Sequence, residues 1–410
     1  MTIKTHSSQP VSMLLVTLLA LLTALDAMAI DLYLPAMPTI AEALQVSPGE
    51  VQQTLAVFLA GLAIGQGIYG PLLDRFGRRS PLLIGIGIFV AGSVIAALSS
   101  SIEWLLFARF IQALGAAAGL VAPRAIIDDL YDLEDSARMQ SILMQVMMVA
   151  PIAAPILGGV LLLHWQWSSL FWVMAILGLL GFAWGTKTVP NSQPVEERVS
   201  LSIKAIIHVY GGLLLQPRFV LYTITSGLVL GSFFSYISGS SFVFIEHFKL
   251  SATQYSQIFA VNSVGLVIGG AISNQLIKRG LSTHKIMILG ILGYTLFAGI
   301  LLVVVESSLY SLLSYAALLS LTIACLGLVF GNLVALTMNA SISPAGMTSA
   351  MMGMAQYLLS AIIGFIVSMT PTSIVQLPTT IAICGAIAIL LCTIASNIKS
   401  QSSDLRAIEG

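Results

Sequence analysis

The chain has 410 residues, of which 57% are hydrophobic and only 8% are charged, and its formal net charge is zero. Its mean hydropathy is +0.98. One soluble core cannot hide this much apolar surface, so the composition excludes an ordinary soluble domain and indicates an integral membrane protein.

Twelve apolar runs are long enough to cross a bilayer, because a spanning helix needs about 20 apolar residues. The runs lack the in/out alternation of membrane β-strands. The predicted fold class is therefore all-α, with twelve transmembrane helices. They lie at about 11–34, 51–71, 81–99, 103–123, 139–163, 168–187, 218–243, 253–276, 284–305, 309–332, 347–370 and 377–398.

The first run carries two carboxylates, Asp26 and Asp31. A charge near the bilayer centre costs about 2.5 to 3.5 kcal/mol on insertion scales, so such a residue faces a cavity or a partner and marks a working site. Two acids in one helix suggest protonation chemistry. The alternative for Asp31, which lies shortly before Pro35, is a packing contact or a place in the headgroup zone.

The cations predict the orientation. Of the 17 Lys and Arg residues, only Arg109 and Lys249 do not fall on one side of the twelve-span arrangement. By the positive-inside rule, both termini are expected in the cytoplasm. Lys4 and the run Ala27-Met28-Ala29 also resemble a cleaved signal peptide. Cleavage would leave eleven helices and place the C-terminus against the charge bias, so we predict a retained first helix.

Histidine and cysteine give no sign of a metal site. The three cysteines lie inside predicted spans without paired spacing, and the five histidines lie in tails, loops or helix ends. Buried, inert thiols are the expected state. We therefore expect neither a metal nor another cofactor.

The two halves of the chain share a weak internal repeat. At an offset of 204 residues, Gly61-Leu62 aligns with Gly265-Leu266, and Arg75 aligns with Arg279. Glycines at this spacing are common in packed membrane helices, but matched positions at half the chain length favour two parallel six-helix repeats. We predict bundles at 1–187 and 218–410, joined by a cytoplasmic linker, 188–217, that carries an interfacial helix.

The segment between the second and third runs reads Gly-Pro-Leu-Leu-Asp-Arg-Phe-Gly-Arg-Arg and resembles a loop motif of the major facilitator superfamily. Its glycines permit a tight turn and close helix approach. Asp74 is expected to accept from a helix N-terminus or to pair with arginine, as part of a gate. The repeat places Lys278 there in the second half. The predicted gating residues of this segment are Gly70, Asp74, Arg75, Gly77 and Arg78.

The fourth run contains Arg109, Gln112 and Gly115, in a pattern similar to one found in proton-coupled members of that superfamily, with Ala113 where a glycine is usual. An unpaired guanidinium in lipid is costly. Counted at about 1.5 Å per residue, Asp31 reaches a similar depth, so an Asp31–Arg109 ion pair is the simplest neutralisation. Gln112 is expected to lie level with Asp26.

The fifth run resembles an antiporter signature, with Ala154 in place of its first glycine. Prolines remove backbone donors and bend a helix, while glycines allow close packing. The residues predicted to serve gating here are Pro151, Pro155, Gly158 and Gly159.

Further segments resemble the Bcr/CflA group of drug:proton antiporters, which includes bicyclomycin and chloramphenicol exporters. They are 31–38, 124–131 and 137–139 in the first half and 242–246 in the second. Asp128 departs from that group, which often has arginine there. The resemblance implies the major-facilitator fold, with two pseudo-symmetric bundles, and proton-coupled export of small amphipathic drugs. The implied setting is the inner membrane. The implied partners are a small-molecule substrate, protons and lipid, with no nucleic acid, and the implied state is a monomer.

The predicted proton-coupling residues are Asp26, Asp31 and Arg109. Alternatives are an exporter of an endogenous siderophore, sugar or amino acid, and, from other classes, a channel or a membrane-embedded enzyme. The spans hold no nucleophile–base pair or ligand cluster, which argues against an enzyme, and a channel does not require a half-chain repeat. The predicted substrate-binding residues are Asp26, Tyr33, Gln112, Met144, Met148, Phe234, Tyr236, Asn262 and Gln356.

Overall fold

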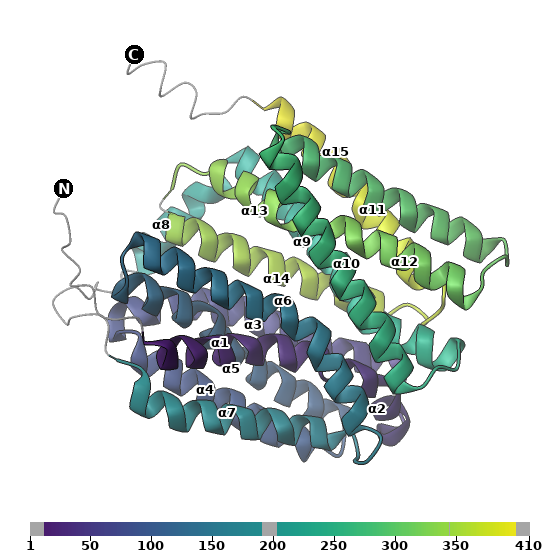
Figure 1. Ribbon diagram of the computed structural model, residues 1–410, viewed down its shortest axis with the longest axis horizontal. Helices are drawn as coiled ribbons and strands as arrows, with labels where there is room; N and C mark the ends of the chain where they lie inside the picture. Colours follow the sequence, from purple (N-terminus) through teal and green to yellow (C-terminus); the bar gives the residue numbers. More distant parts are fainter. Residues whose placement is uncertain (1–11, 191–202, 344, 399–410) are drawn as a thin grey trace. The chain divides into compact units, whose positions relative to one another are not determined.

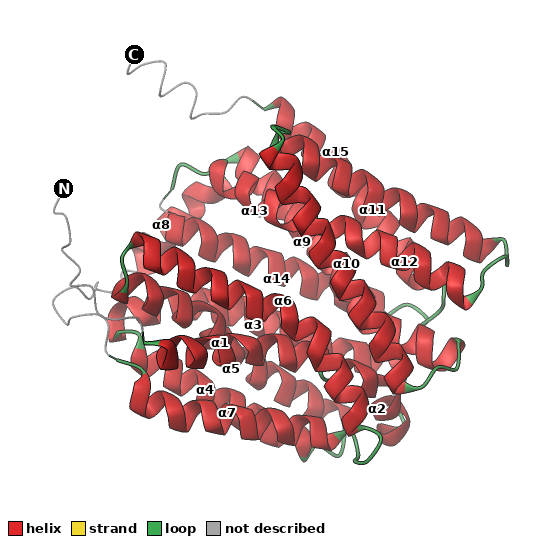
Figure 2. Ribbon diagram, viewed as in Figure 1, coloured by secondary structure: helices red, strands yellow, loops and turns green. Residues whose placement is uncertain are grey.

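The computed structural model describes residues 12–190, 203–343 and 345–398. In these ranges the regular elements are all helices, with no strand (Figure 2). Twelve of the described helices are long and apolar enough to cross a membrane. The predicted all-α class and the twelve spans are therefore confirmed. The predicted tails and residues 191–202 of the predicted linker lie outside the described ranges.

Seven α-helices and a short 3-10 turn precede residue 190 (Figure 1). The helices that follow α1 alternate with short connections, as the apolar runs predict. In chain order they are α1 (Met13–Asp31), η1 (Leu34–Ala36), α2 (Met37–Leu44), α3 (Pro48–Phe76), α4 (Arg79–Ala97), α5 (Ile102–Leu130), α6 (Leu133–Leu161) and α7 (Ser168–Thr188).

The helices after residue 202 include one, α8, inside the segment predicted to carry an interfacial helix. Two pairs of elements each form one span: α9 continues into the π-helix η3, and α12 is followed by α13. In chain order they are α8 (Ile203–Leu214), α9 (Pro217–Ser241), η3 (Phe242–His247), α10 (Ala252–Lys278), α11 (Thr283–Glu306), α12 (Leu312–Leu326), α13 (Phe330–Asn339), α14 (Ala345–Ser368) and α15 (Gln376–Asn397).

The chain divides into two compact units. Unit 1 combines Met1–Gln45 with Val57–Leu201, and unit 2 combines Val46–Ala56 with Ser202–Gly410. The first turns of α3 thus group with unit 2. The bundle boundaries expected at residues 187 and 218 stay a prediction.

Local chemistry explains why helices form where they do. Backbone groups inside a bilayer must be satisfied internally, which an α-helix achieves within one segment. Side chains then cap the ends: the Ser251 hydroxyl accepts from the Gln254 N–H at 3.1 Å, and the Gln254 side chain accepts from the Ser251 N–H at 2.9 Å. This reciprocal capping box fixes the start of α10. Several helices continue past their apolar runs, as α3 does to Phe76, because polar residues tolerate the membrane surface.

Glycines bring α5 into close contact with two neighbours in unit 1. A Cβ atom on Gly115 would lie 2.2 Å from the Phe89 backbone nitrogen of α4, and one on Gly119 would lie 2.6 Å from the Leu22 carbonyl oxygen of α1. A side chain at either position would force the helices apart. This packing sets α1, α4 and α5 close enough for polar side chains to interact between them.

Candidate functional site

Unit 1 buries three charged residues within its membrane-spanning segments. Asp26 and Asp31 on α1 are 3% and 4% exposed, and Arg109 on α5 is 0% exposed. Charged groups are rarely buried in this way unless they are paired or functional. The three residues predicted to couple protons therefore lie in one buried region of one unit.

Arg109 makes its hydrogen bonds to neutral groups. Its Nη1 donates to the Ala29 carbonyl oxygen at 2.9 Å and to Gln112 Oε1 at 2.6 Å. Gln112 Nε2 donates in turn to Ser93 Oγ at 2.8 Å, and Ser93 donates to the Phe89 carbonyl oxygen at 2.8 Å. A hydrogen-bonded chain thus runs from α1 through α5 to α4.

The predicted ion pair between Asp31 and Arg109 is wrong. Among the described residues the guanidinium forms no ion pair with Asp31, and the carboxylate with which it interacts electrostatically is Asp26. Asp31 interacts in turn with Asp26. The physical reason is local: α1 ends at Asp31, and the ring of Tyr33, just beyond, lies beside the guanidinium with its centroid 5.0 Å from the Arg109 Cζ atom.

Three aromatic rings surround the guanidinium. Besides Tyr33, the Phe58 ring of α3 lies 4.2 Å from Arg109 Cζ and the Phe171 ring of α7 lies 5.9 Å away. A cation over an aromatic face is stabilised by about 0.5 to 2 kcal/mol, the larger value when water is excluded. Sequence reasoning missed Phe58, Phe171 and Ser93, because they come from three other helices and belong to no motif.

Several polar atoms of this buried region lack hydrogen-bond partners. Within the described residues these are Asp26 Oδ1 and the Nε and Nη2 atoms of Arg109. An unsatisfied buried polar atom costs about 1 to 3 kcal/mol, and more when it is charged. Such atoms call for an explanation, and a site that exchanges protons or waters supplies one.

A second cluster of charges lies where α3, α4 and α5 end or begin. Arg78 donates to Asp74 at 2.6 Å and to Asp129 at 2.8 Å. Burial alone lowers the pKa of Arg78, but the bonds to Asp129 and Asp74 outweigh it and raise that pKa above its usual value. The predicted pairing of Asp74 with an arginine is therefore present, within unit 1.

The turn of this segment depends on one of its two glycines. Gly77 has φ of +79°, a left-handed conformation that favours glycine. Gly70 instead lies inside α3, and a Cβ there would meet nothing within 4 Å. The expected role of Gly70 in a turn or a close approach is therefore wrong, because α3 continues six residues past it. Arg75 is exposed and lies over the Phe76 ring.

Helix α6 runs unbroken through both predicted proline positions, Pro151 and Pro155. Gly158 provides close packing, since a Cβ there would lie 2.2 Å from the Leu32 carbonyl oxygen. Gly159 is buried. Met144 and Met148 are 53% and 51% exposed.

The remaining predicted binding residues lie in unit 2. Asn262 Nδ2 donates to the Tyr236 hydroxyl at 2.8 Å, and its Oδ1 accepts from Ser320. The Tyr236 ring stacks on Phe259, with centroids 5.6 Å apart and planes at 7°. Among the predicted residues, Asp26 and Gln112 thus lie near Arg109 in unit 1, and Asn262 pairs with Tyr236 in unit 2. Phe234 contacts Tyr357, and Gln356 donates to Ser226.

Comparison with known proteins identifies the family. A family model described as the Major Facilitator Superfamily matches residues 19–368. The chain is 33% identical over 371 residues to the "Uncharacterized MFS-type transporter YdgK" of Bacillus subtilis (strain 168), covering 88% of this chain and 90% of that protein. It is 28% identical over 273 residues to the "Bicyclomycin resistance protein homolog" of Haemophilus influenzae, covering 67% and 69%.

A solved structure shows the same fold. The xylose transporter XylE from E. coli, in a partially occluded inward-open conformation, matches with a TM-score of 0.72 and 16% identity, covering 95% of this chain and 98% of that one. At this identity the similarity concerns the fold alone. The twelve-helix architecture, the family model and the relatives agree, and the chain therefore belongs to the Major Facilitator Superfamily as a multi-pass membrane transporter.

Proposed function

We propose that this transporter is a proton-coupled antiporter that exports small amphipathic compounds from the cytoplasm by alternating access. One observation carries the proposal: two carboxylates and one guanidinium are buried together in unit 1, with Asp26 Oδ1 and two arginine nitrogens unpartnered in the described chain. Binding or release of a proton changes the net charge of this buried cluster. The free energy of the helix bundle in unit 1 therefore depends on whether the proton is bound.

Charge counting supports one exchangeable proton at a time. With both acids ionised, the cluster of Asp26, Asp31 and Arg109 carries one net negative charge, and one bound proton makes it neutral. A neutral buried cluster is favoured in a low-dielectric interior. We infer that one of the two acids holds a proton in part of the cycle and releases it in another, while Arg109 remains charged.

The cations support the orientation that we propose. Their bias to one side supports a cytoplasmic location for both termini. The inner membrane as the setting and a monomer as the state are proposed from the resemblance to the Bcr/CflA group. The Arg78 cluster then belongs to the cytoplasmic gate, with the Gly77 turn, and the α6 prolines and glycines belong to the moving parts. The residues predicted to bind substrate remain proposed contacts, and each unit contributes some of them. Relatives named for drug resistance support a drug-like substrate.

The test begins with a susceptibility screen of an exporter-deficient host that expresses the chain, which supplies a substrate. Purified protein is then placed in vesicles, and uptake is driven by a pH gradient. Asp31→Asn should abolish gradient-driven transport and leave substrate binding measurable, because the carboxamide keeps the shape and cannot release a proton. Unchanged gradient-driven transport in Asp31→Asn would remove that residue from the coupling mechanism.

A further inference from the structure

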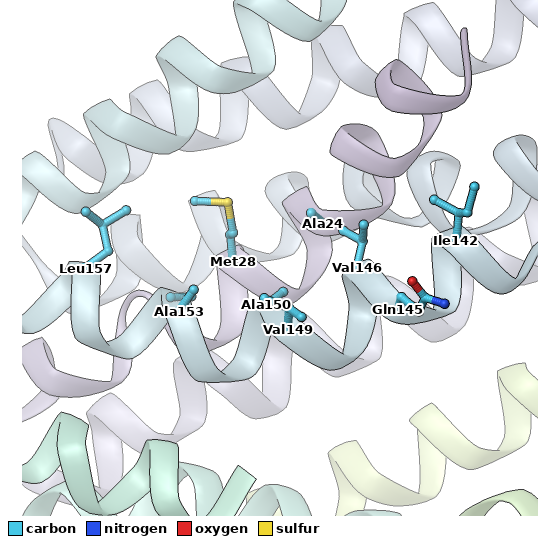
Figure 3. A pocket seen from close by; sticks show the side chains of 10 residues that line it. Ala24, Met28, Ile142, Gln145, Val146, Val149, Ala150, Ala153 and Leu157 are labelled. Atoms are coloured by element: carbon cyan, nitrogen blue, oxygen red, sulfur yellow. The ribbon is translucent and has the colours of Figure 1, made fainter. Parts of the chain in front are cut away.

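Unit 1 contains an apolar groove between α1 and α6, with a volume of about 470 Å³. Two of its lining residues come from α1 and the others from α6 (Figure 3). Met28 and Leu157 lie towards one end of the groove, and Ile142 and Gln145 lie towards the other (Figure 3). Pockets that hold drug-sized ligands measure roughly 300 to 1,000 Å³, so the space suits one small molecule.

The lining contains no charged side chain. Its one polar residue is Gln145, and the rest are alanine, methionine, leucine, isoleucine and valine. Asp26 is two residues from both Ala24 and Met28, which places it about 200° around α1, on the opposite face. Asp31 follows Met28 by a turn, but it is 4% exposed and does not line the groove. A cation in the groove would thus lose water without gaining a counter-ion.

The position of Gln145 argues against lipid tails as the occupant. Gln145 is exposed, and it lies about 4 Å along α6 from the middle of the span Glu134–Leu161, at 1.5 Å per residue. An exposed amide at that depth is costly in hydrocarbon. The groove therefore opens towards a polar surrounding, from which a solute can enter.

We propose that this groove is the subsite for the apolar part of the substrate, and that the substrate is an uncharged compound. The inference rests on the proposed function and names the class of its substrate. Met28 adapts the shape of one end, as flexible thioether side chains do, and Gln145 offers one hydrogen bond at the other. Because α1 carries the groove on one face and Asp26 on the opposite face, a substrate in the groove acts on the same helix as Asp26 without touching that carboxylate.

The test uses the full-length protein in lipid nanodiscs and two aromatic probes. N-phenyl-1-naphthylamine is uncharged and becomes fluorescent in apolar surroundings, whereas tetraphenylphosphonium is a cation. Saturable binding of the uncharged probe above that of empty nanodiscs is expected. Ala153→Phe fills the groove and should weaken this binding at least tenfold. The matched control is Ile156→Phe on the same helix, at an exposed residue outside the lining, and it should change affinity less than twofold.

A gain of binding protects the test against a folding defect. Gln145→Glu places a carboxylate in the groove. The variant protein should therefore bind tetraphenylphosphonium at least tenfold more tightly than the wild type does, and it should bind the uncharged probe more weakly. Unchanged affinity for both probes in Ala153→Phe and Gln145→Glu would overturn the proposal. So would binding that occurs in detergent and disappears in nanodiscs, because lipid tails would then fill the groove.

The two proposals fail separately. If the uncharged probe binds as expected but a pH gradient does not move it across vesicles, the groove assignment stands and the proton-coupling proposal is wrong. If gradient-driven export of the probe persists at wild-type affinity in Ala153→Phe, proton coupling stands and the groove assignment is wrong.

Discussion

Three kinds of interaction hold the Arg109 side chain: hydrogen bonds, contacts with aromatic rings, and attraction to the charge of Asp26. Two hydrogen bonds to neutral oxygens and three aromatic rings fix the side chain, while Asp26 supplies charge without a direct ion pair. A guanidinium always carries its charge, so it can stabilise the acids in their ionised form without itself titrating. This arrangement leaves the carboxylates available to protons.

The charge of Arg109 is therefore expected to set the pH range of transport. In Arg109→Ala, the ionised acids lose a favourable charge, so they hold their proton to higher pH. The midpoint of the pH dependence of substrate binding should move upwards. Titration of binding against pH in wild type and variant measures this, with Gln112→Ala as a variant that removes a hydrogen bond and keeps the charge. Identical midpoints in wild type and Arg109→Ala would show that the guanidinium does not act on the acids.

The identities of the buried charges were predictable from the sequence, but their partners were not. Depth along a helix follows from counting residues, and this placed Asp31 and Arg109 at similar levels. Direction around the helix depends on packing with helices far away in sequence. The ring of Tyr33 and the Ala29 carbonyl oxygen therefore occupy positions beside Arg109 that the prediction assigned to Asp31.

At the scale of helices, close packing of α5 on α4 holds the site together. Gly115→Ala would place a Cβ atom 2.2 Å from the Phe89 backbone nitrogen, which cannot move without shifting α4. Overpacking of this kind costs about 1 to 3 kcal/mol, so the thermal unfolding midpoint in detergent should fall. Gly87→Ala on α4 is the control, because its Cβ meets nothing within 4 Å. Equal midpoints for the two variants would contradict this role of Gly115.

The Arg78 cluster joins the ends of three helices through two unequal partners. The Asp74 side chain is 56% exposed and that of Asp129 is 24% exposed. Exposed ion pairs contribute about 0 to 1 kcal/mol, whereas loss of Asp129 leaves a largely buried Arg78 with only its exposed partner. Asp129→Asn should therefore slow transport more than Asp74→Asn, and the double variant should deviate from additivity because both act through Arg78.

Initial transport rates in vesicles measure this difference, and Glu103→Gln provides the same charge change at an exposed acid of α5. A larger effect of Asp74→Asn would show that its carboxylate acts on something other than Arg78. The turn at Gly77 and the arginines were readable from the motif. The partner Asp129 was not, because its contact with Arg78 joins residues 51 positions apart.

For the whole molecule, the apolar runs predicted the twelve spans well, because bilayer thickness fixes helix length. The family and its fold followed from short motifs at helix ends and inside the fourth and fifth spans. The grouping of the first turns of α3 with unit 2 was not predictable, since it depends on contacts between distant parts of the chain. The groove was missed for a similar reason, because its lining comes from α1 and from α6 residues near Met144 and Met148 rather than from those methionines.

The charge carried per cycle follows from the buried cluster and the uncharged groove together. If one proton exchanges for one uncharged substrate, each cycle moves one elementary charge across the membrane, so membrane potential alone should drive export. A potential of 100 mV corresponds to about 2.3 kcal/mol per charge, which is a concentration ratio of roughly 50. Vesicles with a potassium gradient and valinomycin, at equal pH on both sides, should therefore concentrate the uncharged probe. Asp31→Asn should remove this response.

A divalent cation should be exported poorly, because one proton would exchange for two positive charges and the potential would oppose transport. Export of the uncharged probe that depends on the pH gradient and ignores the potential would mean that a second charge moves with each cycle, and the single-proton account of Asp26, Asp31 and Arg109 would be wrong.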